Sequence, residues 1–157
     1  MRYDLGYALM TTFTGFLART ILYFRRTELK YMLNIIKDDG SKILDFGCNT
    51  GYFANMIKVR NTTCKVYGTD INKFALDYAR KRYKNINFPY LDKNFCHKNI
   101  NKFDIIILSH VLEHVKNPKK LINKLSKLLN KNGRLILSVP QERIRGDATI
   151  PQLLYNL

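Results

Sequence analysis

The run DIIILS, from Asp104 to Ser109, places four apolar residues in a row between polar ones. A run without alternation is typical of a strand that is covered on both faces, because side chains on both sides of the strand must then be buried. Two comparable stretches are KILDFG, from Lys42 to Gly47, and CKVYGTD, from Cys64 to Asp70. We therefore expect a sheet that carries helices on both of its faces.

Segments with a helical spacing of apolar residues alternate with these strands. Helices are expected over residues 27–37, 51–60, 72–83 and 118–130, and two further strands over residues 86–90 and 134–140. The last helix should begin at Pro118, end at Asn132-Gly133, and bury Leu121, Ile122, Leu125, Leu128 and Leu129. The alternation predicts an α/β fold with a doubly wound, mostly parallel sheet of about five strands. Ligands of such sheets bind beyond the carboxyl ends of the strands.

Two of those strand ends carry residues suited to a ligand. The first strand runs into DFGCNTG, from Asp45 to Gly51, and glycines in such a turn let the backbone approach a ligand closely. The second strand ends at Asp70, whose carboxylate can accept two hydrogen bonds from a ribose diol. Taken singly, the turn could be a tight structural loop and the acid a helix cap. Together, the glycine turn and Asp70 indicate a ligand site far more specifically than either feature does alone.

Four stretches resemble the class I S-adenosylmethionine-dependent methyltransferases. They are KILDFGCNTGYF, VYGTDIN, FDIIILSHVLEHV and KLLNKNGRLILSVP, and they occur in the family's order across about residues 41–140. The resemblance, and the Leu-Glu-His-Val subgroup in particular, implies a Rossmann-like fold, S-adenosylmethionine as cofactor and methyl transfer (EC 2.1.1.-). The family's sheet normally has seven strands, and we expect the last two to be missing, because few residues follow Pro140.

The resemblance also implies the site residues. The methionine end of the cofactor would contact Asp45, Gly47, Cys48, Asn49, Gly51, Tyr52 and Phe53; the ribose and adenine would contact Asp70, Ile71 and Asp92; Ser109 and His110 would flank the methyl group. Asn49 replaces a usual glycine, and Asn tolerates positive φ. His110 is the candidate catalytic base because imidazole titrates near neutral pH, and the alternative is a plain pocket wall.

The pattern His110-x-x-Glu113-His114 also matches a zinc motif of some metallopeptidases. Catalytic zinc needs a third protein ligand, and the pair should lie within a helix. Here His110 directly follows a strand, and Pro118 leaves little room for a long helix. We therefore expect no metal and assign the pattern to the methyltransferase motif.

The net charge is +15, from 27 Lys and Arg against 12 Asp and Glu, and such a surface attracts anions including nucleic acid. The subgroup favours a small molecule, lipid or sugar as the unidentified acceptor. The alternatives are a nucleic-acid methyltransferase and a non-catalytic cofactor-binding subunit of a complex. A shortened sheet would expose its last strand, and an exposed edge invites a second copy or a partner.

We expect a single domain with three parts: a helical cap over residues 1–40, the methyltransferase core over residues 41–140 and a tail over residues 141–157. Residues 7–24 are apolar but contain four threonines and Arg19, which favours an amphipathic or capping helix, or one bound at a membrane surface, over a transmembrane segment. The three cysteines form no Cys-x-x-Cys pair, which favours a reducing, cytoplasmic location.

Overall fold

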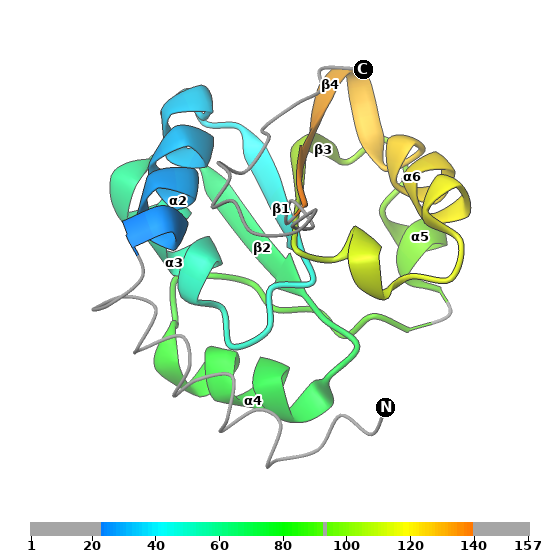
Figure 1. Ribbon diagram of the computed structural model, residues 1–157, viewed down its shortest axis with the longest axis horizontal. Coiled ribbons are helices and arrows are strands. Elements are labelled where there is room, and N and C mark those ends of the chain that lie inside the picture. Colours follow the sequence, from blue (N-terminus) through cyan, green and yellow to red (C-terminus); the bar gives the residue numbers. More distant parts are fainter. Residues whose placement is uncertain (1–22, 93, 140–157) are drawn as a thin grey trace, which may run out of the picture.

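One parallel sheet organises the protein (Figure 1). The computed structural model describes residues 23–92 and 94–139. The strands are β1 (Lys42–Phe46), β2 (Lys65–Thr69), β3 (Phe103–Ser109) and β4 (Leu129–Ser138), in the order β2-β1-β3-β4. All pairs are parallel, and β1 lies between β2 and β3. The predicted α/β fold with a doubly wound sheet is confirmed.

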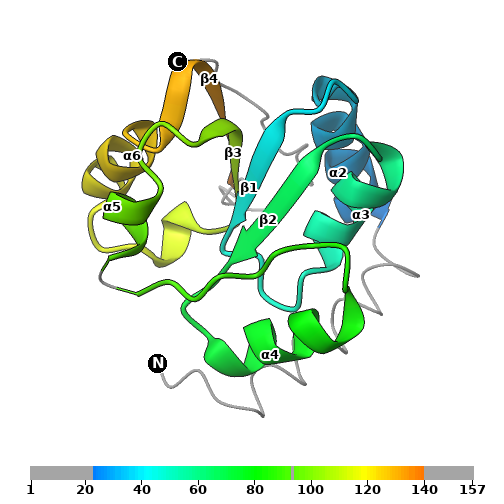
Figure 2. The same ribbon diagram turned by 180° about the vertical axis from the view of Figure 1, so that it is seen from behind.

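Helices cover both faces of the sheet, as Figures 1 and 2 show. They are α2 (Tyr23–Ile35), α3 (Tyr52–Arg60) and α4 (Lys73–Arg82) on one face, and α5 (Phe95–Lys98) and α6 (Pro118–Ser126) on the other. A short 3₁₀ helix, η1 (Leu112–His114), follows β3. Each helix layer packs its own apolar cluster against the sheet, so the sheet is buried between them.

The apolar run of β3 belongs to both clusters. Ile105 and Ile107 pack with α2 and α3, whereas Ile106 and Leu108 pack with α5 and α6. All four side chains are at most 2% exposed. Successive strand residues point to opposite faces, so a strand covered twice needs apolar residues at every position. The predicted stripe of α6 is confirmed for Leu125, which is fully buried, and for Leu121 and Ile122, which are partly buried. Leu128 and Leu129 are buried against the same cluster but follow the end of α6.

Two predicted details are wrong. Residues 86–90 do not form a strand; their one ladder contact is an isolated bridge between Asn87 and Tyr67, and Pro89 has no N–H to donate. Asn132-Gly133 does not end a helix, because α6 ends at Ser126 and β4 already begins at Leu129. The pairing of β4 with β3 shifts register between Phe103 and Ile105, so residues 130–133 form an irregularity inside the strand.

Other expectations fall on residues that the structure does not describe. The helix expected over residues 7–24 lies largely outside the described ranges, as does the region of the last two family strands. The division at residues 40 and 140 stays a prediction. In residues 23–92 and 94–139, no helix has the length and apolar character needed to cross a bilayer.

Truncating the core strand should destabilise the fold. Leu108→Ala should lower the free energy of unfolding by about 2–5 kcal/mol, because a fully buried leucine leaves a cavity. Val59→Ala is the control, since Val59 is 69% exposed and should change stability by roughly 0.5 kcal/mol or less. Urea unfolding followed by circular dichroism measures both. Equal effects of the two substitutions would contradict this description of the core.

Candidate active site

The turn between β1 and α3 is fastened to the end of β2. The backbone N–H groups of Gly47 and Cys48 both donate to the carbonyl oxygen of Thr69, at 2.8 and 3.0 Å. Three residues of the turn have positive φ: Gly47 at 83°, Asn49 at 49° and Gly51 at 76°. Asn49 therefore adopts the kind of positive φ that Asn tolerates where the family has glycine.

Two glycines of the turn are required by packing as well as by φ. A Cβ on Gly47 would lie 2.5 Å from Cγ2 of Val111, and a Cβ on Gly51 would lie 2.7 Å from Cζ of Phe88. Both distances are too short for carbon atoms that are not bonded. The turn therefore packs closely against Val111, which follows β3. The ends of β1 and β3 lie together at one edge because the two strands pair in parallel.

Asp45 lies at this edge, near the end of β1, and is 2% exposed. Its carboxylate accepts a hydrogen bond from the backbone N–H of Ala54, but Oδ2 has no partner among the described residues. Burial raises the pKa of Asp45 to about 7, the charge of Asp70 adds to the rise, and the Ala54 hydrogen bond opposes it. The site therefore contains a buried carboxyl group with an unused oxygen.

Asp70 follows β2 and closes the other side of the turn. Its Oδ2 accepts from the backbone N–H of Asn49 and its Oδ1 from that of Asn72, both at 2.8 Å. Burial raises its pKa although these backbone hydrogen bonds act in the opposite direction. Each carboxylate oxygen has a further lone pair for a ligand. Ile71, beside it, is 59% exposed and offers an apolar surface.

His110 stands at the end of β3, and an acid from α2 contacts it. Nε2 of His110 lies 3.1 and 3.0 Å from Oε1 and Oε2 of Glu28, while Nδ1 lies 3.4 Å from Oε1 of Glu113. The hydroxyl of Ser138, at the end of β4, also donates to Glu28. Glu28 was not among the predicted residues, although it lies four positions before the buried Met32 and hence on the buried face of its helix.

The structure gathers most of the predicted site residues at one edge of the sheet. Asp45, Gly47, Cys48, Asn49, Gly51, Asp70, Ile71, Ser109 and His110 lie at or directly after the ends of β1, β2 and β3, and Tyr52 and Phe53 begin α3. Burial raises the pKa of the Cys48 thiol well above its ordinary value, and the charges of Asp45 and Asp70 add to the rise. Asp92 is exposed, accepts a hydrogen bond from the N–H of Asn94 at 2.9 Å, and forms an ion pair with Lys98.

The His-x-x-Glu-His pattern does not lie within one helix. His110 precedes η1, which contains Glu113 and His114. In the described ranges, no group of three His, Cys, Asp or Glu side chains is arranged to hold a metal ion.

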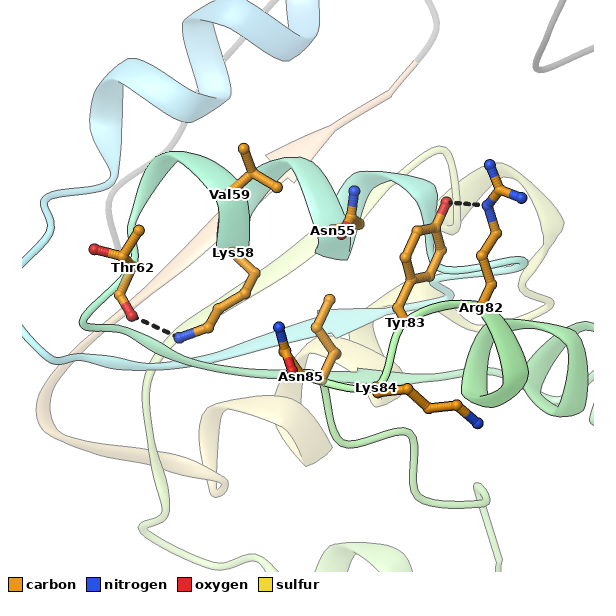
Figure 3. A pocket seen from close by; sticks show the side chains of 9 residues that line it. Asn55, Lys58, Val59, Thr62, Arg82, Tyr83, Lys84 and Asn85 are labelled. Carbon is orange, nitrogen blue, oxygen red and sulfur yellow. Dashed lines mark hydrogen bonds between the residues drawn. The ribbon is translucent and has the colours of Figure 1, made fainter.

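A separate hollow of about 570 Å³ lies between α3 and the end of α4 (Figure 3). Its lining comprises Asn55, Lys58, Val59, Thr62, Arg82, Tyr83, Lys84, Asn85 and Ile86, with three basic and no acidic side chains. Lys58 already donates to the carbonyl oxygens of Thr62 and Cys64, just before β2 begins. This part of the hollow lies near the start of β2, whereas Asp45 and Asp70 lie at the carboxyl ends of β1 and β2.

Comparison with known proteins identifies the family. Residues 16–155 match the family described as "Methyltransferase domain". The chain belongs to this methyltransferase family. The predicted membership of the methyltransferase family is confirmed, whereas the Leu-Glu-His-Val subgroup and the absence of the last two strands stay predictions.

Individual methyltransferases resemble parts of the chain. A ubiquinone biosynthesis O-methyltransferase of Coxiella burnetii is 30% identical over 115 residues, covering 71% of this chain and 48% of that protein. A TehB-like SAM-dependent methyltransferase of Corynebacterium glutamicum has a TM-score of 0.69 at 17% identity, covering 88% and 75%. Coclaurine N-methyltransferase, bound to N-methylheliamine and SAH, has a TM-score of 0.61 at 24% identity, covering 71% and 35%. The chain spans about half the length of the curated relatives that it matches.

The cofactor of this methyltransferase is S-adenosylmethionine, and the residues at the edge fit it. The unpartnered oxygen of Asp45 suits the ammonium of the methionine part, because a buried carboxylate is stable only when it is paired. The remaining lone pairs of Asp70 suit a ribose diol. The positive φ values of Gly47, Asn49 and Gly51 form the tight turn that follows β1 at this edge.

Neutralising Asp45 should stabilise the ligand-free protein. The folded carboxyl group binds its proton up to about pH 7, whereas in the unfolded chain it loses the proton near its ordinary pKa of 3.8. The contribution of this group to the free energy of unfolding therefore falls as the pH rises from about 4 to about 7, and then levels. Asp45→Asn should remove this loss, which is on the order of 4 kcal/mol above pH 7.

Thermal unfolding of both proteins between about pH 4 and pH 8 measures the effect. Asp104→Asn is the matched control, because it removes an acid at the opposite end of the sheet. If Asp45→Asn and the wild type show parallel pH profiles, the folded carboxyl group is not protonated near neutral pH.

Proposed function

We propose that this methyltransferase transfers a methyl group from S-adenosylmethionine to a small-molecule acceptor, with lipids and sugars included in that class (EC 2.1.1.-). The observation that carries the proposal is the placement of Asp45, Asp70 and His110 at the carboxyl ends of adjacent parallel strands. This edge lies where the chain turns from one side of β1 to the other, which is where doubly wound sheets bind ligands.

The residues at the edge divide into two groups by the part of the reaction they serve. S-adenosylmethionine, when bound, supplies a methyl group on a positively charged sulfur. Asp45 would hold the ammonium group and Asp70 the ribose, with Cys48, Asn49, Tyr52 and Phe53 around the methionine part. Ser109 and His110 would face the acceptor. The protein's contribution is alignment of the acceptor with the methyl group.

Ile71 and Asp92 are the residues proposed to contact the adenine. Ile71 is exposed beside Asp70, and an adenine ring would cover its side chain. Asp92 would accept from the adenine amino group, as the family resemblance implies. Its carboxylate is already engaged by the N–H of Asn94 and by Lys98, so this role requires one of its remaining lone pairs.

The small acceptor is favoured by the relatives' names. One relative is a methyltransferase of ubiquinone biosynthesis, and one structural neighbour methylates a nitrogen of coclaurine. The names of both proteins refer to small molecules, and the two proteins share this chain's sequence or fold. The acceptor of this chain itself would be found by screening hydroxyl and amine compounds with methyl-labelled cofactor.

A nucleic-acid acceptor is the second candidate, and the hollow in Figure 3 favours it. Lys58, Arg82 and Lys84 line that hollow without any acid, on a chain with a net charge of +15. Phosphates could approach there without repulsion from carboxylates in the lining. A third candidate is a non-catalytic cofactor-binding subunit, which would bind S-adenosylmethionine and methylate no acceptor.

Association and location are further proposals. β4 is an edge strand of the described sheet, and we propose that a second copy or a partner protein pairs with it. A cytoplasmic location rests on the cysteines: Cys48, Cys64 and Cys96 are all free thiols, which suits a reducing compartment.

Removing the charge of Asp70 should weaken cofactor binding. Asp70→Asn keeps the shape of the side chain but replaces a charged acceptor, so the Kd for S-adenosylmethionine should rise by about tenfold to a hundredfold. Asp77→Asn on α4 is the control, because its side chain is 49% exposed and hydrogen-bonds to Arg80 and Tyr90. Calorimetric titration measures both. Unchanged affinity in Asp70→Asn would contradict the proposed site.

The nucleic-acid candidate has a separate test. Titration of a fluorescent single-stranded RNA at several salt concentrations gives the slope of log affinity against log salt. The double substitution Arg82→Ala and Lys84→Ala should reduce that slope by roughly 1–2 if the hollow binds phosphates. The control, Lys119→Ala and Lys124→Ala on α6, removes the same charge elsewhere. Equal reductions in the two variants would show diffuse attraction and exclude the hollow.

A further inference from the structure

A buried acid connects α2 to the ends of two strands. Glu28 is 4% exposed, and three side chains from the far part of the chain contact its carboxylate. Nε2 of His110 lies 3.0 Å from Oε2, the hydroxyl of Ser109 lies 3.4 Å from Oε1, and the hydroxyl of Ser138 donates to Oε1. A buried carboxylate requires such donors, because an unpaired charge in the interior is costly.

These contacts favour one tautomer of His110. An ionised Glu28 can only accept, and Nε2 then donates to it. The other nitrogen, Nδ1, then carries a lone pair and lies 3.4 Å from Oε1 of Glu113, whose side chain is 24% exposed. Nδ1 and Glu113 are therefore two acceptors that face each other, and a proton placed between them would satisfy both.

The position of His110 suits contact with an acceptor. Its imidazole is 23% exposed, and the next residue, Val111, packs against Gly47 of the turn after β1. Its backbone has a φ of 55°, a region that residues other than glycine rarely occupy, and its N–H donates to the carbonyl oxygen of Ser138 at 2.9 Å. Strained backbone of this kind is often found at functional sites, where surrounding contacts hold it.

We propose that Glu28 is a positioning residue that fixes His110 with Nδ1 toward the acceptor, so that Nδ1 and Glu113 together receive the acceptor's proton. This inference rests on the proposed methyltransferase function. The acceptor's O–H or N–H bond breaks and its proton moves to Nδ1. The acceptor's oxygen or nitrogen forms a bond to the methyl carbon while the carbon–sulfur bond breaks, and that electron pair stays on sulfur. The proton is shared between Nδ1 and Glu113 and then passes to water.

The tautomer of His110 tests the proposal directly. Nitrogen NMR of the full chain with ¹⁵N-labelled histidine distinguishes a protonated Nε2 from a protonated Nδ1 in each ring. His110→Asn assigns the signals against those of His97 and His114, and Asn tolerates the positive φ. In the wild type, the neutral ring of His110 should carry its hydrogen on Nε2. Glu28→Ala should give a mixture of the two tautomers, and Glu113→Gln should leave Nε2 protonated.

Glu28→Gln covers the case in which Glu28→Ala fails to fold. Its side-chain oxygen can still accept from Nε2, so the Nε2–H tautomer should persist in a folded variant. A wild-type ring protonated on Nδ1, or a folded Glu28→Ala variant in which His110 still carries its hydrogen wholly on Nε2, overturns the proposal. Titration of the same samples with S-adenosylmethionine tests the proposed function separately from the role of Glu28. Glu28→Ala should bind S-adenosylmethionine within about twofold of the wild-type affinity, since Glu28 acts through His110. A wild type that binds no cofactor would refute the proposed function, whereas the tautomer reports on Glu28 alone.

Discussion

The buried carboxyl group of Asp45 is the constraint on which the rest of the site depends. It lies in β1, one of the two inner strands of the described sheet, is almost fully buried, and has one oxygen without a partner among the described residues. Such a group destabilises the ligand-free fold when ionised. A cation bound at the unpartnered oxygen of Asp45 would remove this cost.

The same edge of the sheet serves two purposes through different strands. The ends of β1 and β2 supply Asp45 and Asp70, which carry negative charge toward a cofactor. The ends of β3 and β4 supply Ser109, His110 and Ser138, which are organised around the buried Glu28 of α2. Cofactor binding and proton transfer are thus assigned to neighbouring groups that share few contacts, so substitutions in one group should leave the other largely intact.

The sequence predicted the parts of this arrangement that depend on local pattern. The apolar run of β3, the positive φ at Asn49 and the acids at the ends of β1 and β2 follow from residue type and spacing. The strand expected over residues 86–90 did not form, because Pro89 lacks a donor and one bridge at Asn87 is its ladder contact. Glu28 was missed because it meets His110 across 82 positions of sequence, although a charged residue four positions before Met32 was a detectable signal.

The central claim is that S-adenosylmethionine binds at this edge with its ammonium on an ionised Asp45. The most direct test is the number of protons released on binding, obtained by calorimetry at about pH 6 in buffers of different ionisation enthalpy. Because the pKa of Asp45 is about 7 in the free protein, binding should release roughly 0.9 proton at that pH and clearly less near pH 7.5. Binding without proton release at about pH 6, or no binding at all, would contradict the account.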